Sequence, residues 1–481
     1  MHVHELHPPQ LWAAFAALNA VPRASKREEQ VQTHIMNALR ALGLEPRRDA
    51  VGNIAASKPA TPGMENRPKV ILQAHLDMVH QKNADTVFDF NTEGIRMRVD
   101  GDWVRAEGTT LGADNGIGVA AILAVLGAKD VAHPALEALF TCDEETGMTG
   151  ALGLQPGFVE GAILLNLDTE DDDEFSIGCA GGVDVTSSGE YASATPTGTH
   201  GLRIAVRGAT GGHSGMDIHL GRANANKVLN RLVAAAWEDC GLEIASWDGG
   251  GLRNAIPRES AVWVAVEDAA GVRAALERAF APVREEYRTT DPGLRLEVAD
   301  AEVPGQVMPR EVQEALVWAV AACPNGIHRM SPDVPGLVQT SNNLARIQAA
   351  DGHVSINCLC RSSVNSEKDD HARSIAAAFA LAGLATDFGG SYPGWTPNPN
   401  SPIVALMRGL YVERFASEPR IQACHAGLEC GILGGALPGC DMVSFGPTIR
   451  GAHSPDECVS VPSVAKFYGF FLDVLAHIPA A

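Results

Sequence analysis

Three short apolar segments in the first third of the chain alternate with helical sequence. The segments are Lys69–His75, Ala135–Thr141 and Ala162–Leu167, and the Ala-, Val-, Leu- and Ile-rich run Gly116–Gly127 between the first two predicts a helix. Apolar strands that alternate with helices are typical of a layered α/β domain with a mostly parallel sheet. The sequence therefore predicts an α/β fold for this part of the chain.

The chain is too long for one ordinary hydrophobic core. With 481 residues, two or three domains are expected. The α/β character ends near Ser187–Thr199, which is rich in Ser, Thr and Gly, and it returns after the proline-rich segment Pro393–Pro402. We expect one domain formed by residues 1–187 and 396–481, interrupted by an inserted domain at residues 188–395.

The inserted segment has an α+β pattern. A strand at His200–Arg207 is followed by a helix at Arg222–Trp237, two strands around Asn254–Pro257, a helix at Gly271–Tyr287 and a strand at Leu294–Val298. This βαββαβ order is that of a ferredoxin-like unit. We expect this topology for the inserted domain.

A second, weaker copy of the pattern follows in the insert. It comprises a helix at Arg310–Ala322, strands at Leu344–Ala349 and His353–Leu359, and a helix at Lys368–Ala382. The two copies share negligible sequence identity, so the doubling is a topological hypothesis.

The composition of the chain limits the classes of partner and the cellular compartment that we expect for it. The formal net charge of −21 argues against nucleic acid and anionic membranes as partners. The 10 cysteines are scattered without a CxxC pair, which is typical of reduced thiols in a cytosolic protein. No apolar run reaches the roughly 20 residues that cross a bilayer, and the N-terminal residues lack the blocks of a signal peptide. We expect a cytoplasmic protein that acts on small molecules.

Polar clusters follow the apolar strands or occupy glycine-rich turns. They are His75-Leu-Asp77, Asp114, Asp143-Glu-Glu145, Asp168 and His453. In an open α/β sheet, ligands bind beyond the carboxyl ends of the strands, so these distant residues are candidates for one crevice. Two histidines and several carboxylates without a thiolate suit Zn²⁺, or a comparable divalent ion, at a catalytic site.

Each cluster by itself has a simpler structural interpretation. Asp114 alone is an acidic residue at the start of a helix, and His75 alone is a strand-end histidine with an ordinary hydrogen bond. Glu144 and Glu145 alone form an acidic loop, and Asp168 begins an acidic run that is usually solvated. The clusters favour a metal site only when they are taken together.

Five motifs in a fixed order resemble a known family. His75-Leu-Asp, Gly112-Ala-Asp-Asn-Gly-Ile-Gly, Cys142-Asp-Glu-Glu-Thr-Gly, Asn166-Leu-Asp-Thr-Glu-Asp and Gly451-Ala-His-Ser-Pro-Asp-Glu occur in this order. The series resembles the co-catalytic zinc metallopeptidases, which include aminoacylase, carnosinase and the tripeptidases. The resemblance covers essentially the whole chain, and it implies a three-layer catalytic domain of the zinc-exopeptidase type with an inserted lid.

The resemblance also implies roles in the α/β domain. Two Zn²⁺ ions, for which Mn²⁺ or Co²⁺ would substitute, are bound by His75, Asp114, Glu145, Asp168 and His453. Asp114 bridges both ions, the glycines beside it let backbone and metals approach closely, and its peptide bond to Asn115 has an unusual geometry. Glu144 is implied as the general base and Asp77 as the residue that orients His75.

Further candidates concern the substrate. The resemblance implies His213, in Gly211-Gly-His-Ser-Gly, as a lid donor to the oxyanion, which requires closure of the lid. Arg361 is expected to bind the free α-carboxylate and Asn254 to lie near the reacting carbonyl. His425 and Glu429 are expected to shape the pocket from the α/β domain. For each of these residues, an ordinary surface or turn position is the alternative.

The implied activity is metal-dependent hydrolysis of dipeptides with broad specificity, including dipeptides with a C-terminal histidine. An N-acyl amino acid deacylase with the same site is the alternative, and a metal-storage or protein-binding relative without turnover is a third hypothesis. A homodimer is the family default. In relatives whose lid has a single copy of the pattern, two subunits pair through their lids, and the partner's lid histidine completes the site. An insert with two copies could imitate this pairing within one chain, so a monomer is the alternative.

Overall fold

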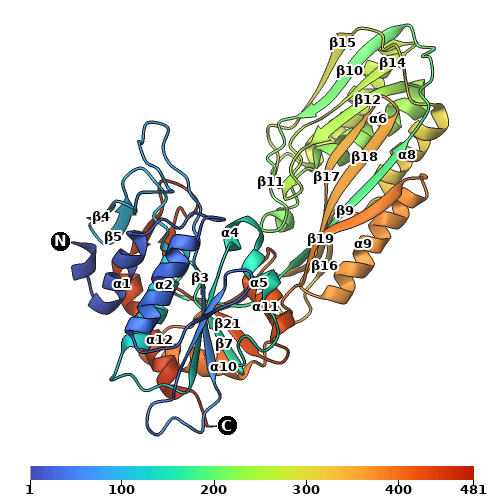
Figure 1. Cartoon of the computed structure of the whole chain (residues 1–481). Coiled ribbons are helices and arrows are strands. Elements are labelled where there is room, and N and C mark those ends of the chain that lie inside the picture. Colours follow the sequence, from blue (N-terminus) through green and yellow to red (C-terminus); the bar gives the residue numbers. More distant parts are fainter. Residues whose placement is uncertain (1, 481) are drawn as a thin grey trace. The chain divides into compact units, whose positions relative to one another are not determined.

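The computed structural model describes residues 2–480, which form two compact units (Figure 1). Unit 1 consists of the chain up to Gly178, of Pro397–Ala423 and of the chain from Leu428 onward. Unit 2 consists of Cys179–Thr396 and of the short segment Cys424–Gly427. The chain therefore leaves unit 1 and returns to it, as expected for an inserted domain.

Unit 1 is built on an eight-stranded mixed sheet. Its strand order is β1 (Arg47–Arg48), β2 (Ile54–Lys58), β6 (Leu136–Thr141), β3 (Val70–His75), β7 (Ile163–Asn166), β21 (Asp441–Ser444), β8 (Glu174–Cys179) and β20 (Arg420–Cys424). The four central strands β6, β3, β7 and β21 are parallel, whereas β2 and β8 are antiparallel to their inner neighbours. The α/β prediction is confirmed, with the parallel pairing concentrated in the centre of the sheet.

Both faces of the central sheet are covered. Every residue of β3 and β6 is buried, which requires layers on both sides. The helices of unit 1 are α1 (Pro9–Asn19), α2 (Glu29–Ala41), α3 (Ala113–Gly127), α4 (Glu144–Gly147), α5 (Thr149–Gly153), α10 (Pro402–Phe415), α11 (Glu429–Ala436) and α12 (Val461–His477). Helix α3 is apolar on all sides and almost wholly buried, as expected for a helix inside a core.

A small four-stranded sheet in unit 1 contains two strands of the C-terminal region and the turn that joins them. It runs in the order β22 (Ile449–Arg450), β23 (Cys458–Ser460), β5 (Trp103–Ala106) and β4 (Met97–Asp100). Strands β22 and β23 are antiparallel, and the turn between them carries His453. His453 has a φ of +64°, so the turn bends sharply at this residue.

Unit 2 contains one long antiparallel sheet. Its order is β15 (Arg295–Ala301), β10 (His200–Arg207), β14 (Ser260–Val266), β12 (Glu243–Gly250), β17 (Val338–Ala350), β18 (His353–Ser362), β9 (Gly181–Glu190) and β19 (Ala385–Tyr392), with β16 (Gly326–Met330) paired to β17. The helices α6 (Ala225–Cys240), α7 (Ala269–Glu286), α8 (Arg310–Ala322) and α9 (Asn365–Ala380) share its hydrophobic core.

The sheet of unit 2 is two ferredoxin-like halves joined edge to edge. Strands β10, β12, β14 and β15 follow the ferredoxin-like order in one half, and β9, β17, β18 and β19 repeat that order in the other. Pairing of β12 with β17 joins the halves. The first strand of the second half thus precedes the whole first half in the chain.

The strand β9 changes the expected domain boundary. The expected boundary between residues 187 and 188 falls inside β9, and Cys179 is the first residue of unit 2. Strand β9 pairs along its whole length with β18 and also with β19, so it cannot be divided between units. Its Gly-, Ser- and Thr-rich sequence lacks the apolar run of the strands in unit 1, and for this reason the sequence predicts the boundary inside it.

Candidate functional site

The polar clusters of unit 1 meet where parallel strands end. Strand β3 ends at His75, β6 leads through Thr141 into Asp143-Glu-Glu145, and β7 leads into Asp168. These three strands are parallel neighbours, so their carboxyl ends lie at one edge of the sheet. The register alone therefore brings these residues together.

One group of side chains surrounds His75. Its Nε2 atom is 3.1 Å from Oδ1 of Asp114 and 3.5 Å from Oδ1 of Asp168. The imidazole is 1% exposed. Asn115 donates from Nδ2 to the Asp168 carboxylate and to the carbonyl oxygen of Leu167 (2.9 Å), which ties the start of α3 to the end of β7.

A second group surrounds His453. Its Nε2 atom is 3.3 Å from Oδ2 of Asp114 and 3.1 Å from Oε2 of Glu145. The two oxygens of Asp114 therefore face two different histidines, one from the end of β3 and one from the turn between β22 and β23. This is the arrangement that a carboxylate shared by two cations requires. The peptide bond between Asp114 and Asn115 is cis, in agreement with the unusual geometry that the resemblance implies.

The donor set suits a divalent cation. One ligand atom each from His75, Asp114 and Glu145 lies within 4.8 Å of the others. Oε1 of Glu145 is buried without a hydrogen-bond partner. Burial raises the pKa of Asp168 to about 6, and the neighbouring Asp114 carboxylate adds to the rise. Buried carboxylates crowded in this way are stabilised by a cation, and imidazole with carboxylate oxygen is a zinc-type ligand set.

Asp77 contacts both the histidine and the glutamates. Its side chain is fully buried, and Oδ1 is 3.3 Å from Nδ1 of His75. The same carboxylate accepts the backbone N–H groups of Glu144 (3.0 Å) and Glu145 (3.3 Å). Asp77 therefore fixes the imidazole and the start of α4 relative to each other, which is more than the sequence predicted for it.

Glu144 and Glu429 complete the acidic edge of the sheet. Glu144 begins α4, and burial raises its pKa well above the ordinary value. Glu429, at the start of α11, is 1% exposed, and its Oε2 accepts hydrogen bonds from Nε2 of Gln73 (2.7 Å) and Oγ1 of Thr141 (2.8 Å). Oε1 of Glu429 is buried without a partner, and burial raises its pKa to about 7.

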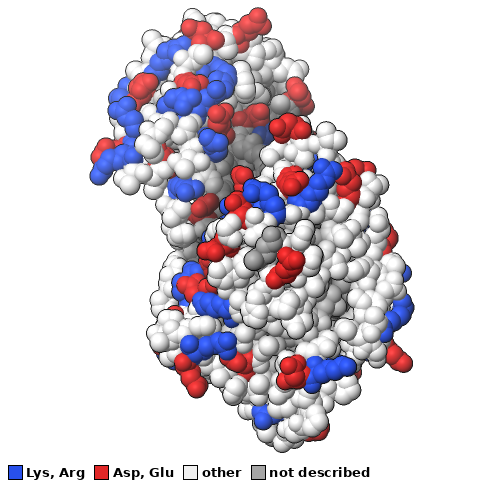
Figure 2. Space-filling view, turned by 90° about the vertical axis from the view of Figure 1, so that its left-hand side faces the viewer, with Lys and Arg blue, Asp and Glu red and all other residues white. Residues whose placement is uncertain are grey.

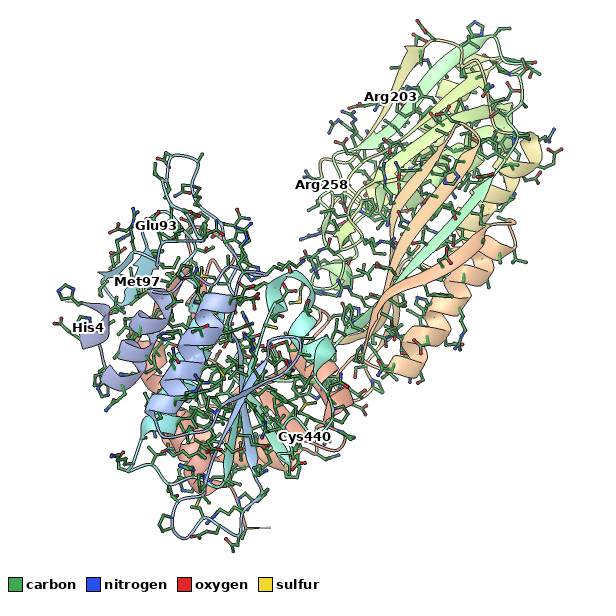
Figure 3. All side chains as sticks on the ribbon, viewed as in Figure 1. His4, Glu93, Met97, Arg203, Arg258 and Cys440 are labelled. Carbon is green, nitrogen blue, oxygen red and sulfur yellow. The ribbon has the colours of Figure 1, made fainter. Side chains whose placement is uncertain are left out.

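His213 lies in a tight turn of unit 2. The short strand β11 (Gly212–His213) pairs with β13 (Ala255–Ile256), and the carbonyl of Asn254 accepts the N–H of Ser214 (2.8 Å). Figure 3 labels Arg258, which packs on Gly211 of the turn and donates to the carbonyl of Ala209 (3.2 Å). The pairing of β11 with β13 places the candidates His213 and Asn254 side by side.

Backbone hydrogen bonds determine the tautomer of His213. Nδ1 accepts the N–H groups of Gly215 (3.1 Å) and Met216 (3.0 Å), so the proton of the neutral ring is on Nε2. Burial lowers the pKa of His213, and the charge of Arg361 lowers it further. The ring is thus a neutral donor through Nε2–H.

Arg361 and His425 form a second polar group in unit 2. Arg361, on β18, is 5% exposed and donates from Nη1 to the hydroxyl of Tyr392 (2.9 Å), while its Nε has no partner. Nε2 of His425 is 2.7 Å from Oγ of Ser341, a strand partner of Arg361. Burial lowers the pKa of His425 to about 3, with Arg361 as the next cause, so this ring is neutral.

His425 does not belong to the α/β domain, contrary to the prediction. The segment Cys424–Gly427 is part of unit 2. The carbonyl of Ala426 accepts the N–H of Ala180 (2.9 Å), and a Cβ at Gly215 would strike the carbonyl of His425. These long-range contacts, which no local pattern encodes, assign the segment. Glu429 lies in unit 1, as expected.

Several residues around these groups were missed by sequence reasoning. Ser341 and Tyr392 lie on strands of the second ferredoxin-like half and contact His425 and Arg361. Arg23 and Glu457 are charged but only 2% exposed. Glu457 closes the motif that contains His453, which was the one available signal.

The chain is similar to known proteins over almost its whole length. The sequence pattern of the peptidase family M20/M25/M40 matches residues 71–477. The cytosol non-specific dipeptidase of Escherichia coli (strain K12) is 43% identical over 479 residues, which cover 99% of this chain and 99% of that protein. The crystal structure of aminoacylhistidine dipeptidase from Vibrio alginolyticus matches with a TM-score of 0.96 at 41% identity, over 100% of this chain and 99% of that one. Aminopeptidase PepT from Bacillus cereus, at 15% identity and a TM-score of 0.58, covers 98% of this chain and 99% of its own, and it shares the fold.

Proposed function

We propose that this chain, which belongs to the peptidase family M20/M25/M40, is a metal-dependent dipeptidase of broad specificity. The resemblance drawn from the five motifs is thereby confirmed. The observation that carries the proposal is that the two oxygens of Asp114 face His75 and His453, with Asp168 and Glu145 beside them. Dipeptides with a C-terminal histidine are included among the substrates, because the aminoacylhistidine dipeptidase is 41% identical.

The donor set supports two Zn²⁺ ions, for which Mn²⁺ or Co²⁺ would substitute. His75, Asp114 and Asp168 would hold one ion, and Asp114, Glu145 and His453 the other. When bound, such cations polarise a carbonyl group and lower the pKa of water. Asp77 would keep Nε2 of His75 directed at its ion by holding Nδ1.

Glu144 would move the protons of the reaction. Its carboxylate takes a proton from the water whose oxygen attacks the peptide carbonyl carbon. As the C–N bond breaks, the same carboxyl group gives a proton to the leaving amine nitrogen. The result is a free amino acid at each end of the cleaved bond, and Glu144 returns to its initial ionised state.

Residues of unit 2 would bind the substrate. Nε2–H of His213 is a neutral donor suited to the oxyanion of the tetrahedral intermediate. The buried Arg361 guanidinium would pair with the free α-carboxylate, and Asn254 and His425 would contact the peptide beside it. Glu429 would line the pocket from unit 1 through its unpartnered Oε1.

A test of the proposal is the Glu144→Gln variant. We expect it to bind zinc as the wild type does and to lose about 10²- to 10⁴-fold in kcat/KM on a dipeptide, because the proton acceptor is gone.

Unchanged turnover of this variant would contradict the role of Glu144. A wild-type protein that cleaves no dipeptide with added Zn²⁺, Mn²⁺ or Co²⁺ would contradict the proposed function. Equal cleavage of N-acyl amino acids would favour the deacylase, which needs no free α-amino group.

Small dipeptides are the partners that we propose, in the cytoplasm. The net charge of −21 disfavours nucleic acid, and acidic and basic side chains are intermingled on the face shown in Figure 2. Among the helices of residues 2–480, we find no candidate for a membrane-spanning segment. The homodimer and the monomer are separated by a sedimentation measurement of mass.

A further inference from the structure

Two buried charged side chains without a role in the proposed reaction hold the loop that carries Asp114. Arg23 follows α1, and Glu457 lies four residues after His453. Each is 2% exposed. A buried charge is costly unless it is fully hydrogen-bonded, so the partners of these two residues indicate what they do.

Glu457 accepts four backbone N–H groups at the start of α3. Its Oε2 binds the N–H groups of Leu111 (2.7 Å) and Gly112 (2.9 Å). Its Oε1 binds those of Ala113 (2.7 Å) and Asp114 (3.3 Å). The first N–H groups of a helix have no partner within it, and the helix dipole favours an anion there. One carboxylate thus fixes every peptide N–H from Leu111 to Asp114.

Arg23 donates hydrogen bonds to a backbone carbonyl group of the same loop and to carbonyl groups that follow β3. Its Nη2 donates to the carbonyl of Gly112 and to Oδ1 of Asn19 (3.0 Å). Its Nη1 donates to the carbonyls of Leu76 (3.1 Å) and Asp77 (3.2 Å), immediately after His75. The guanidinium therefore joins the end of β3 to the loop before α3.

The glycines of this loop make room for Arg23. A Cβ at Gly116 would lie 2.6 Å from Nη2 of Arg23, and one at Gly112 would lie 2.8 Å from Sδ of Met78. Both distances are shorter than real Cβ contacts. The approach of backbone and metals that the sequence predicts for these glycines stays a prediction, and the structure adds that they leave room for side chains packed against the loop.

We propose that Glu457, assisted by Arg23, is a positioning residue for the metal centre. It holds the Leu111–Asp114 backbone so that the two oxygens of Asp114 face His75 and His453 before any cation binds. The inference rests on the proposed role of Asp114 as the shared ligand. A preformed ligand loses less conformational freedom on binding, which strengthens metal affinity.

The test compares Glu457→Gln with Asp456→Asn. Both variants remove one negative charge from the same turn, but Asp456 is exposed and its side chain is not part of the site. In Glu457→Gln, an amide NH₂ group replaces one carboxylate oxygen. This NH₂ group is a donor, so it cannot accept the hydrogen bonds of the two backbone N–H groups that it faces. We expect the Kd for Co²⁺ to rise about 10- to 100-fold in Glu457→Gln, with an altered Co²⁺ absorption spectrum, and to be unchanged in Asp456→Asn. Wild-type Co²⁺ affinity in Glu457→Gln would overturn the proposal, even if thermal stability falls.

Hydrogen exchange of the metal-free wild type tests the same point without a variant. We expect the amides of residues 111–114 to be protected, because Glu457 binds them in the absence of metal. Exchange at the rate of an unstructured peptide would overturn the proposal. Because this measurement uses the wild type, it tests the proposal even in the case that the Glu457→Gln variant fails to fold. Failure of the wild type to bind Co²⁺ would instead contradict the proposed function.

Discussion

At the scale of single residues, Asp114 connects two groups that lie far apart in the chain. Its Oδ1 faces His75 and its Oδ2 faces His453. A carboxylate has lone pairs on both oxygens, so one aspartate can serve two cations. The closest histidine contacts of the neighbouring acids are divided between the two groups: Oε2 of Glu145 lies 3.1 Å from Nε2 of His453, and Oδ1 of Asp168 lies 3.5 Å from Nε2 of His75.

Replacing Asp114 by alanine should therefore remove both metal ions together. The expected metal content falls from two per chain to none, measured by elemental analysis after dialysis. Asp130→Ala, an exposed position just beyond the other end of α3, should keep the wild-type content. Retention of one tightly bound ion in Asp114→Ala would contradict the bridge.

His213 and His219 differ in chemistry although they share a loop. His213 is half-buried and held as the Nε2–H tautomer, whereas His219 is exposed and belongs to a short 3₁₀ turn. The sequence favours His213 because of the Gly211-Gly-His-Ser-Gly turn in which it lies. The hydrogen bonds to Nδ1 of His213 give the chemical difference that the sequence does not show.

His213→Ala should lower kcat about 10²- to 10³-fold on a dipeptide, as the loss of one oxyanion donor does. Metal content should stay unchanged, because the metal ligands that we propose are all in unit 1. His219→Ala is the matched control and should keep wild-type kinetics. Equal effects of the two substitutions in steady-state assays would contradict the role of His213.

At the scale of elements, the start of α3 depends on close backbone approach. A Cβ at Gly118 would strike Oδ1 of Asn115 and lie 2.8 Å from the carbonyl of Leu167. Asn115 in turn holds the Asp168 carboxylate. The glycine therefore allows helix and strand to approach at the point where both carry metal-site residues.

Gly118→Ala should lower stability and metal affinity together, since Asn115 must move. Gly409→Ala, in the exposed middle of α10 with nothing near its Cβ, should instead raise the free energy of unfolding by about 0.5–1 kcal/mol. Chemical denaturation with and without Zn²⁺ measures both effects. Equal behaviour of the two variants would show that the space at Gly118 does not matter.

At the scale of the whole molecule, each unit has its own hydrophobic core. One core surrounds the sheet of unit 1, and the other lies between the long sheet and the helices of unit 2. The proposed metal ligands belong to unit 1 alone, whereas His213, Asn254, Arg361 and His425 belong to unit 2. Catalysis by the proposed mechanism needs both units, but metal binding needs one.

Removal of metal by a chelator should therefore destabilise unit 1 selectively. With tightly bound ions, we expect the unfolding transition of unit 1 to fall by about 10 °C while that of unit 2 stays in place. Calorimetry combined with hydrogen exchange of peptides from α3 and α6 assigns the two transitions. A shift of the unit 2 transition alone would contradict this assignment of the site.

Local sequence patterns were enough to predict which residues of unit 1 form the candidate site, and they also predicted much of the layout of this unit. Apolar strands followed directly by His75, the Asp143-Glu-Glu145 cluster or Asp168 are local patterns, and parallel strands necessarily bring their carboxyl ends together. The five motifs were enough to indicate the family.

Contacts between distant segments could not be predicted from the sequence and became visible only in the folded chain. The contacts of Glu457 with the Asp114 loop span more than 340 residues, and β9 is a strand because β18 and β19 pair with it. His425 joins unit 2 because its segment is hydrogen-bonded to Ala180, although Glu429, four residues later, belongs to unit 1. Local sequence records what adjacent residues prefer, whereas hydrogen bonds between distant segments depend on how the whole chain packs.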